Sequence, residues 1–231
     1  MQRLKGELAQ NSGLEIAEDE ADLLLRLRRN RSGEGWEALV RLTPRPLSTR
    51  PWRVCNMPGA LNATLAYAMM RLSEPRAMDR VVNLACGSGT LLVERLGIGP
   101  ARSAIGCDTN SQALECARSN LRAAGYEQLA QLEAWDVAEL PLLDGSSTVI
   151  CADLPFGQLI GSHRENEMLY PRILAEATRI AAHSARLVVL THEVRLFERV
   201  AADYRASWRL ENVVPVRSGG MTPRIFMLRR V

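Results

Sequence analysis

The sequence predicts an α/β fold with a mostly parallel sheet, because short apolar runs alternate with helical stretches from about residue 59 to the end. A glycine-rich turn follows the first of these runs, as in sheets that bind ligands at the carboxyl ends of their strands. The composition of the 231 residues, 47% hydrophobic and 24% charged, is that of a folded protein. We therefore expect one large α/β domain, alone or with a small appendage.

The amino-terminal segment, residues 1–44, predicts one short helix followed by two strands at 21–28 and 36–42. Three elements of this size rarely form an independent core. The segment is therefore either the tail of a larger upstream module or an edge that packs on the main domain. Prolines in the following stretch mark a linker over residues 45–58.

The main domain, residues 59–231, is expected to contain a seven-stranded sheet. The strands are expected at 80–85, 103–107, 129–134, 148–152, 186–190, 208–216 and 224–230. Helical spacing predicts helices at 62–72, from Leu91, at about 111–124 with Asn110 or Ser111 as the cap, and from Pro171 to Ile180. The last two strands flank Ser218-Gly219-Gly220 and predict a terminal antiparallel hairpin.

Several classes of protein are excluded by composition. No stretch approaches the ~18 uncharged apolar residues of a membrane span, and residues 1–7 lack the apolar part of a secretory signal, so we expect a cytoplasmic protein. The five cysteines are odd in number and contain no C-x-x-C pair, so we expect reduced thiols and no zinc site. The three histidines, His163, His183 and His192, lack metal-ligand spacing and are expected in loops or facing solvent.

The net charge of +3 is too small to identify a polyanionic partner, but Lys5 is the only lysine among 29 basic residues. Arginine suits phosphate and base recognition. A GC-rich genome gives the same bias without any function, so both explanations stay open. Arg41, Arg45, Arg50 and Arg53 near the linker are candidates for contact with a phosphate backbone, with ordinary solvated arginines as the alternative.

The glycine-rich turn, Ala85-Cys86-Gly87-Ser88-Gly89-Thr90, joins the first strand of the main domain to the helix that starts at Leu91. Glycines there allow close approach of a ligand and present amides at a helix amino terminus, which implies a nucleoside-containing ligand. The dinucleotide fingerprint requires a third glycine where Leu92 stands, and a phosphate loop requires a lysine, so both motifs are absent.

Two acids follow the next two strands. Asp108 ends the second strand, where a carboxylate accepts both ribose hydroxyls of a bound nucleoside; its alternative role is to cap the following helix. Asp136 follows the third strand and is a candidate acceptor for an adenine amino group, with Trp135 or Val137 against the ring. The arrangement fits S-adenosylmethionine better than a dinucleotide, because no site for a second phosphate-linked nucleotide is visible.

The fourth strand ends in Asp153-Leu154-Pro155-Phe156-Gly157, which carries the most specific signal in the chain. An exocyclic amine conjugated to a ring is a poor nucleophile, because its lone pair is delocalised into the ring. Attack on a sulfonium methyl therefore needs acceptors for the amine hydrogens, here the Asp153 carboxylate and the Leu154 carbonyl. Pro155 restricts the loop, and Phe156 offers a face on which the target base stacks. The alternative is an ordinary turn, since Asp and Pro are frequent in turns.

These motifs resemble the methyltransferase domain of the THUMP-domain-containing tRNA guanine-N2 methyltransferases, relatives of the bacterial ribosomal-RNA guanine-N2 enzymes. The resemblance extends from about Leu42 to the end. It rests on residues 47–50, 58–67, 85–90 and 153–157, on Met168-Leu169-Tyr170-Pro171 and on Gly219-Gly220-Met221. It implies a Rossmann-like class I methyltransferase fold. It also implies that residues 1–44 are the carboxyl-terminal part of a THUMP module, the RNA reader of this family, with an upstream RNA-binding segment missing.

The resemblance further implies roles for individual residues. Asp108 would hold the cofactor ribose, Asp136 the adenine, and Asp153 with Phe156 the guanine. The residues expected to contact S-adenosylmethionine are Ala60, Leu61, Asn62, Asn83, Ala85, Cys86, Gly87, Gly89, Thr90, Asp108, Thr109, Asn110, Asp136, Val137 and Asp153. The expected catalytic residues are Asp153, Leu154, Pro155 and Phe156, and no metal ligand is expected.

Two positions depart from the family's pattern. Asn83 stands where the first motif usually begins with an acid, and the loss of that charge near the sulfonium or the ammonium group would weaken cofactor binding. Gln158 stands where relatives often have a basic residue, which would lower RNA affinity, with Arg164 as the nearest cation. Neither change removes the proposed catalytic group.

The leading hypothesis is therefore methyl transfer from S-adenosylmethionine to the N2 amine of a guanosine in RNA, with tRNA as the expected partner. A second hypothesis is N-methylation of adenine in nucleic acid or of a glutamine amide in protein, because the same acceptor geometry serves both. A third is a non-catalytic RNA-binding or assembly module, in which Asn83 marks loss of activity.

Overall fold

The structure is a computed structural model that describes residues 2–17, 21–30, 32–43, 45–155, 162–217 and 220–231. It divides into two compact units, Met1–Thr49 and Arg50–Val231, which are described separately here. In the described ranges, no helix is both long enough and apolar enough to cross a membrane.

The amino-terminal unit contains a helix, α1 (Gln2–Ser12), and an antiparallel hairpin of β1 (Leu24–Arg29) and β2 (Trp36–Arg41). The turn of the hairpin includes Gly33 and Gly35, whose φ angles of 85° and 76° favour glycine. One helix and two strands are the elements that the sequence predicts. Large apolar side chains of the hairpin stay exposed, Trp36 at 70%, as expected of a unit too small for its own core.

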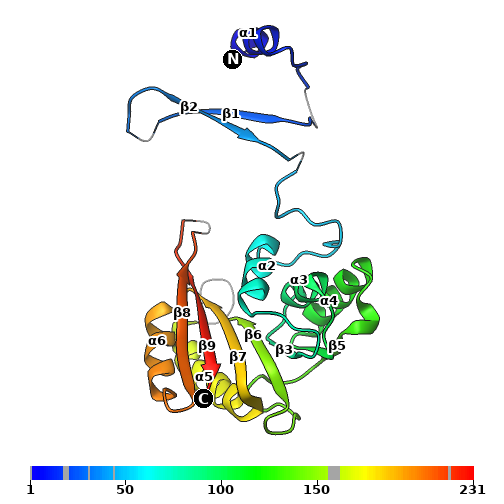
Figure 1. Cartoon of the computed structure of the whole chain (residues 1–231), viewed down its shortest axis with the longest axis vertical. Helices are drawn as coiled ribbons and strands as arrows, with labels where there is room; N and C mark the ends of the chain where they lie inside the picture. The colour runs from blue at the N-terminus through cyan, green and yellow to red at the C-terminus, as the bar shows by residue number, and fades with distance from the viewer. Residues whose placement is uncertain (1, 18–20, 31, 44, 156–161, 218–219) are drawn as a thin grey trace. The chain divides into compact units, whose positions relative to one another are not determined.

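The second unit is built on a seven-stranded sheet with the order β5-β4-β3-β6-β7-β9-β8 (Figure 1). Its strands are β3 (Arg80–Leu84), β4 (Ser103–Cys107), β5 (Gln131–Glu133), β6 (Ser147–Asp153), β7 (Ala181–Thr191), β8 (Trp208–Pro215) and β9 (Arg224–Arg230). Neighbours pair in parallel from β5 to β7, whereas β9 is antiparallel to both β7 and β8. The predicted seven strands, parallel centre and closing hairpin are confirmed.

Helices cover both faces of this sheet. They are α2 (Ala63–Leu72), α3 (Thr90–Ile98), α4 (Ser111–Ala123), α5 (His163–Ile180) and α6 (Val194–Asp203), with a short 3-10 helix, η1 (Glu127–Leu129). Successive residues of a strand point to opposite faces. Val188 of β7 therefore packs with α2 and α3, whereas Val189 packs with α5 and α6. This is the doubly wound, Rossmann-like arrangement, in which ligands bind beyond the carboxyl ends of the parallel strands.

Two helices differ from the expectations. The predicted start at Pro171 is wrong, because α5 begins at His163 and the Ser162 hydroxyl caps it by accepting from the Glu165 amide. Pro171 lies inside α5, where packing of the apolar residues around it maintains a helix that lacks one backbone donor. No helix is predicted between residues 190 and 208, yet α6 forms there and buries Leu196.

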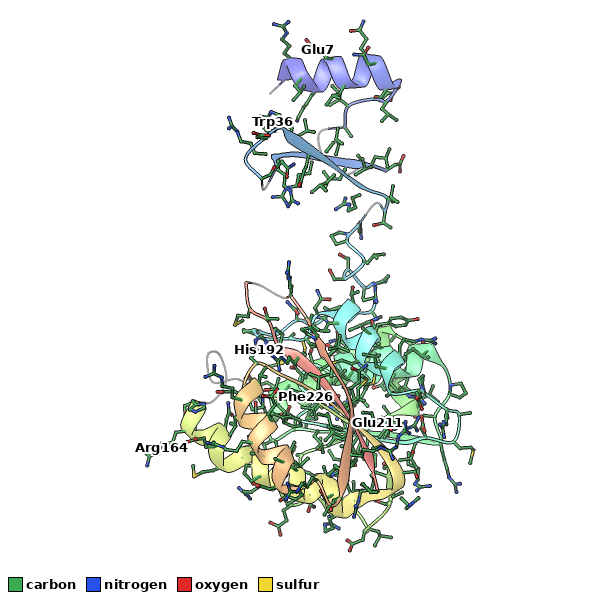
Figure 2. The ribbon with its side chains drawn as sticks, turned by 60° about the vertical axis from the view of Figure 1, so that its left-hand side comes forward. Glu7, Trp36, Arg164, His192, Glu211 and Phe226 are labelled. Carbon is green, nitrogen blue, oxygen red and sulfur yellow. A yellow bond between two sulfur atoms is a disulfide. The ribbon has the colours of Figure 1, made fainter. Side chains whose placement is uncertain are left out.

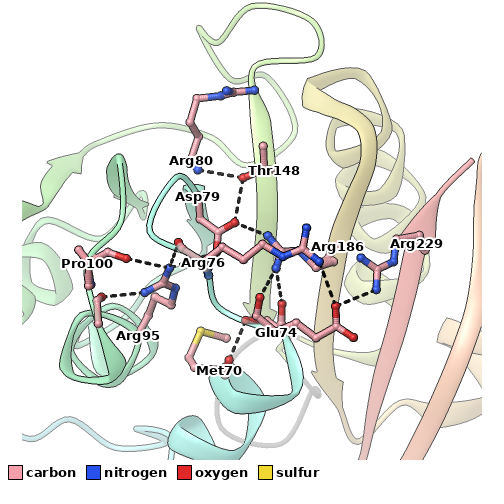
Figure 3. A network of polar contacts seen from close by, with 12 residues as sticks. Met70, Glu74, Arg76, Asp79, Arg80, Arg95, Pro100, Thr148, Arg186 and Arg229 are labelled. Carbon is pink, nitrogen blue, oxygen red and sulfur yellow. Dashed lines mark hydrogen bonds and ion pairs between the residues drawn. The ribbon is translucent and has the colours of Figure 1, made fainter.

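A buried polar cluster supports the amino-terminal end of the sheet (Figure 3). Asp79, directly before β3, is 2% exposed and forms ion pairs with two buried arginines. Arg95 of α3 lies 3.1 Å from its carboxylate, and Arg186 of β7 contacts its other oxygen. Both arginines also donate to backbone carbonyls of the surrounding loops. One carboxylate therefore joins a helix, a central strand and a loop.

A disulfide joins Cys55 to Cys116 of α4, with 5.4 Å between their Cα atoms. The expectation that all thiols are reduced is therefore wrong for this pair; Cys86, Cys107 and Cys151 are free and buried. Cys55 and Cys116 are 61 residues apart in the sequence, so only packing of the segment before α2 on α4 brings them together.

Reduction of this disulfide is expected to lower the free energy of unfolding by about 2–4 kcal/mol, because the cross-link restricts the unfolded chain. The folded state should persist, since the Asn120 side chain accepts from the Cys55 amide and donates to its carbonyl independently of the sulfurs. Thermal unfolding with and without a thiol reductant measures the change. A Cys116→Ser variant should not respond to the reductant; an equal response there would contradict this assignment.

Candidate active site

A cavity of about 480 Å³ lies beyond the carboxyl ends of β3, β4 and β6 and is called the central cavity below. All of the described residues that the sequence predicts as catalytic or cofactor-binding line this cavity, except Asn62 and Gly89. Trp135, the alternative to Val137 as the residue against the adenine ring, does not line it and packs on the core instead. Phe156 lies outside the described residues. The lining residues that were not predicted are Met57, Pro58, Gly59, Ser88, Leu91, Ala113, Leu169 and Ile173. A cavity of this size suits a small organic ligand.

The glycine-rich turn between β3 and α3 forms one wall. Ala85, Gly87 and Gly89 all have positive φ, of 46°, 53° and 76°, so the chain reverses sharply at the strand end. A Cβ on Gly87 would meet no atom within 4 Å, so this backbone stays open to a ligand. Ala85 holds a conformation that L-residues rarely adopt, and such strain is common at binding sites.

The two predicted residues outside the lining have structural contacts instead. The Asn62 side chain caps α2 by accepting from the Thr64 and Leu65 amides at 2.9 and 3.3 Å. Gly89 precedes α3, and a Cβ there would lie 3.0 Å from the Ala117 Cβ of α4. Gly89 therefore permits close packing of α3 against α4, which positions the turn.

Asp108 lies at the end of β4 and faces the glycine turn. Its Oδ2 accepts from the Gly87 amide at 2.8 Å, and its Oδ1 accepts from the Asn110 amide at 2.9 Å. The cap of α4 is Asn110, whose side chain accepts from the Gln112 and Ala113 amides. Asn110, and not Asp108, therefore caps α4. Each carboxylate oxygen keeps further acceptor capacity toward the cavity.

Asn83, the residue that departs from the family's acidic position, lies at the cavity floor and is 1% exposed. Its Nδ2 donates to the carbonyls of Leu84 and Cys151, both at 3.2 Å. Among the described residues, its buried Oδ1 has no hydrogen-bond partner. The amide thus suits the two neighbouring carbonyls, which a carboxylate would repel, and leaves one acceptor for a ligand donor.

Asp136 lines the cavity after β5 and is more exposed. Its Oδ1 accepts from the Ala138 amide at 2.9 Å, and Arg172 of α5 lies 3.8 Å from its Oδ2. Val137 beside it is buried in the core that contains α5. The pair presents a carboxylate edge next to an apolar surface, which suits the amino group and ring of a purine.

Asp153, the last residue of β6, carries the unusual electrostatics of the site. Burial raises the pKa of its carboxyl from 3.8 to about 7. Within the described parts of the chain, no hydrogen bond or ion pair reaches this carboxylate, although it borders the cavity. Asp153 is therefore a hydrogen-bond acceptor without a partner among the described residues, in a partly desolvated environment. A pKa shifted by burial in this way is common among functional carboxylates.

Three of the lining residues that the predictions missed, Met57, Pro58 and Gly59, form the wall before α2. Three contacts within the second unit hold this segment in place. Arg50 pairs with Glu94 of α3 at 2.7 Å, and Arg53 donates to the Leu61 carbonyl at 2.7 Å and to the Thr90 hydroxyl at 3.0 Å. The composition of the linker gives no signal for this wall. The only hint was the family-like run over residues 58–67.

The phosphate patch expected from Arg41, Arg45, Arg50 and Arg53 stays a prediction. Arg41 and Arg45 belong to the first unit, whereas Arg50 and Arg53 belong to the second. Both of the latter are engaged in the contacts that hold the cavity wall. They act as anchors of the wall.

The histidines lie outside the central cavity. His163 is exposed at the start of α5, and its Nδ1 lies 2.9 Å from Glu193. This hydrogen bond raises the pKa of His163. Figure 2 labels Arg164, the next residue of α5, and His192. Across the described residues, no group of three or more His, Cys, Asp or Glu side chains is arranged to hold a metal ion.

The fold and this cavity together define the class: a Rossmann-like methyltransferase fold with its ligand cavity at the strand ends. The chain belongs to the UPF0020 family, RMKL-like, methyltransferase domain, whose profile matches residues 50–224.

Three relatives illustrate the similarity. The human tRNA (guanine(6)-N(2))-methyltransferase THUMP3 is 32% identical over 187 residues, which cover 75% of this chain and 36% of that protein. The tRNA (guanine(6)-N2)-methyltransferase of Thermus thermophilus is 30% identical over 208 residues, covering 90% and 61%. The crystal structure of TrmN from Thermus thermophilus matches with a TM-score of 0.80 and 27% identity, covering 100% of this chain and 66% of that one. The chain thus spans only part of the length of these relatives.

Proposed function

We propose that the chain transfers a methyl group from S-adenosylmethionine to the exocyclic N2 amine of a guanosine in RNA, with tRNA as the substrate class. The observation that carries this proposal is the Asp153 carboxylate, a partly desolvated acceptor that borders the same cavity as the glycine turn and Asp108. Guanine and tRNA enter the proposal through the relatives named above.

The residues of the central cavity fit S-adenosylmethionine. Asp108, held by the Gly87 amide, offers its free lone pairs to the ribose hydroxyls, and Asp136 offers an oxygen to the adenine amino group. The unpaired Asn83 Oδ1 is an acceptor for the ammonium group. When bound, the cofactor supplies an electrophilic methyl group on a sulfonium.

In this proposal, Asp153 and the Leu154 carbonyl accept hydrogen bonds from the guanine amine. These bonds turn the nitrogen lone pair out of conjugation and toward the methyl group, so the catalytic contribution is orientation. Methylation leaves an extra proton on the nitrogen. A carboxylate with a pKa of about 7 is well matched to accept that proton near neutral pH. Phe156 is assigned to stack on the base, as the sequence predicts.

The proposal assigns residues 1–44 to a THUMP-like RNA-binding segment, 45–58 to a connection and 59–231 to methyl transfer in the cytoplasm. The separate first unit with its exposed apolar hairpin supports the first assignment. Residues 50–58 contribute contacts that pack on the catalytic unit, so the connection extends into the cavity wall.

The experiment that tests the proposal combines the chain, isotopically labelled S-adenosylmethionine and a total tRNA pool, followed by digestion to nucleosides and mass spectrometry. Labelled N2-methylguanosine is expected. Label in N6-methyladenosine would support the adenine form of the second hypothesis instead, and a parallel reaction with a protein extract, digested to peptides, would detect label in a glutamine. Cofactor binding without transfer to any of these acceptors would favour the non-catalytic alternative.

Activity is expected to fall as the pH drops through about 7, because the ionised Asp153 is the active form. The logarithm of kcat/KM should rise with a slope near one below that pH and then level off. This acidic limb should disappear in Asp153→Asn; a limb that persists there would assign the titration to another group. The stability of the fold is expected to change in the opposite direction from the activity. Because burial favours the neutral carboxyl, Asp153 contributes a stabilisation that is fully present below pH 3.8 and is lost as the pH rises through about 7.

A further inference from the structure

We propose that Tyr170 and Asn166 of α5 are positioning residues, which hold the Pro155 carbonyl and thereby fix the Asp153 carboxylate and the Leu154 carbonyl for the target amine. This inference rests on the proposed function. Neither residue lines the central cavity, so both act through the backbone of the Asp153–Pro155 segment.

Two side chains converge on a single carbonyl oxygen. The Tyr170 hydroxyl lies 2.6 Å from the Pro155 oxygen, and the Asn166 Nδ2 donates to the same oxygen at 3.0 Å. Both donor residues are 1% exposed, so their side chains are shielded from solvent. A carbonyl has two lone pairs, and here both are engaged by side chains of one helix.

The other side of the segment is held by the sheet. The Leu154 amide donates to the Leu190 carbonyl of β7 at 2.9 Å. Proline has no amide hydrogen, so among the described residues the hydrogen bonds that fix Pro155 all go to its carbonyl, and its ring restricts φ. The Leu154 carbonyl lies between the hydrogen-bonded Leu154 amide and the hydrogen-bonded Pro155 carbonyl. If the hydrogen bonds at Pro155 are lost, the Leu154 carbonyl is therefore free to shift.

A second hydroxyl, that of Thr191, fixes the direction of the Tyr170 hydrogen bond. The Pro155 oxygen only accepts, so the single Tyr170 proton is directed to it. The Thr191 hydroxyl, 2.8 Å from the Tyr170 oxygen, must then donate to Tyr170, while its own oxygen accepts from the Glu193 amide at 2.9 Å. The chain of donors thus runs from the end of β7 through Tyr170 to Pro155.

The helix explains how these side chains reach one point. Asn166 and Tyr170 are four residues apart in α5 and therefore lie on the same face. The Tyr170 ring packs edge-on against Phe197 of α6, with 6.4 Å between ring centroids. Phenylalanine at position 170 would keep this packing and lose only the hydroxyl.

The test is Tyr170→Phe, with Tyr204→Phe as a matched control. The Tyr204 hydroxyl also donates to a proline carbonyl, that of Pro171 at 3.2 Å, but away from the Asp153 segment. Tyr170→Phe is expected to lower kcat for RNA methylation roughly tenfold or more, with an unchanged Kd for S-adenosylmethionine. Asn166→Ala should act in the same direction. The control should stay within about twofold of the unsubstituted chain.

Amide hydrogen exchange supplies a readout that does not depend on activity. Exchange at the Leu154 amide should accelerate in Tyr170→Phe and not in Tyr204→Phe. Unchanged kcat together with unchanged exchange at Leu154 would overturn the inference, as would equal losses in both tyrosine variants. If the unsubstituted chain methylates no RNA, the proposed function fails, and the exchange rates alone decide whether Tyr170 positions this segment.

Discussion

Replacing Asp153 by alanine is expected to lower the rate of methyl transfer by about 10²- to 10⁴-fold, the loss typical of a group that acts directly on a transferred or held proton. The variant loses the acceptor that orients the amine and the base that takes its proton. The remaining cavity keeps Asp108, the glycine turn and Asn83, so the Kd for the cofactor should change by less than about tenfold.

The matched control is Asp203→Ala, which removes an exposed carboxylate at the end of α6. It should leave both the rate and the cofactor affinity unchanged. Single-turnover methylation at saturating cofactor, with calorimetric Kd values for each variant, separates the two effects. Near-normal turnover in Asp153→Ala would show that this aspartate is only a turn residue.

Replacing Asp79 by alanine is expected to lower the free energy of unfolding by about 3–5 kcal/mol, because two buried arginines lose their counter-ion at once. Arg95 and Arg186 are 0% and 5% exposed, and their guanidinium groups would stay buried with carbonyl partners only (Figure 3). Burial already lowers the pKa of Arg186, against the attraction of Asp79. Urea denaturation at neutral pH measures the loss.

Glu74→Gln provides the comparison at the same end of the sheet. The Glu74 side chain is 58% exposed and pairs with Arg76 and Arg229 at 3.5 and 3.3 Å. Because solvent screens this pair, the expected loss is below about 1 kcal/mol. Arg186 bonds to the Glu74 backbone, which the substitution leaves in place. If Asp79→Ala and Glu74→Gln lowered the free energy of unfolding by similar amounts, the claim that the buried ion pairs stabilise the fold more than the exposed ones would be contradicted.

The sheet was predictable from the sequence because its signals are local. Each parallel strand is a short apolar run with a breaker at its end, and the acids at those ends, Asp108, Asp136 and Asp153, follow directly in the chain. Parallel strands bring their carboxyl ends to one edge, so residues at successive strand ends meet around one cavity. Acids that are far apart in the sequence therefore line the same cavity in the fold.

The features that were missed depend on tertiary contacts. Pro171 is a strong local signal for a helix start, but the Ser162 cap and the packing of α5 outweigh it. The Cys55–Cys116 disulfide and the wall beside it arise from a segment that joins α4 only in the folded chain. The convergence of Asn166 and Tyr170 on Pro155 likewise depends on how α5 lies against the end of β6.

Calorimetric titration with S-adenosylmethionine and with its demethylated product, at matched salt, tests the central claim most directly. The account predicts one site of roughly micromolar affinity for both, weakened at least about tenfold in Asp108→Ala, because the ribose acceptor is lost. An absence of binding in the folded, unsubstituted chain, or equal affinity in Asp108→Ala, would contradict the assignment of the central cavity.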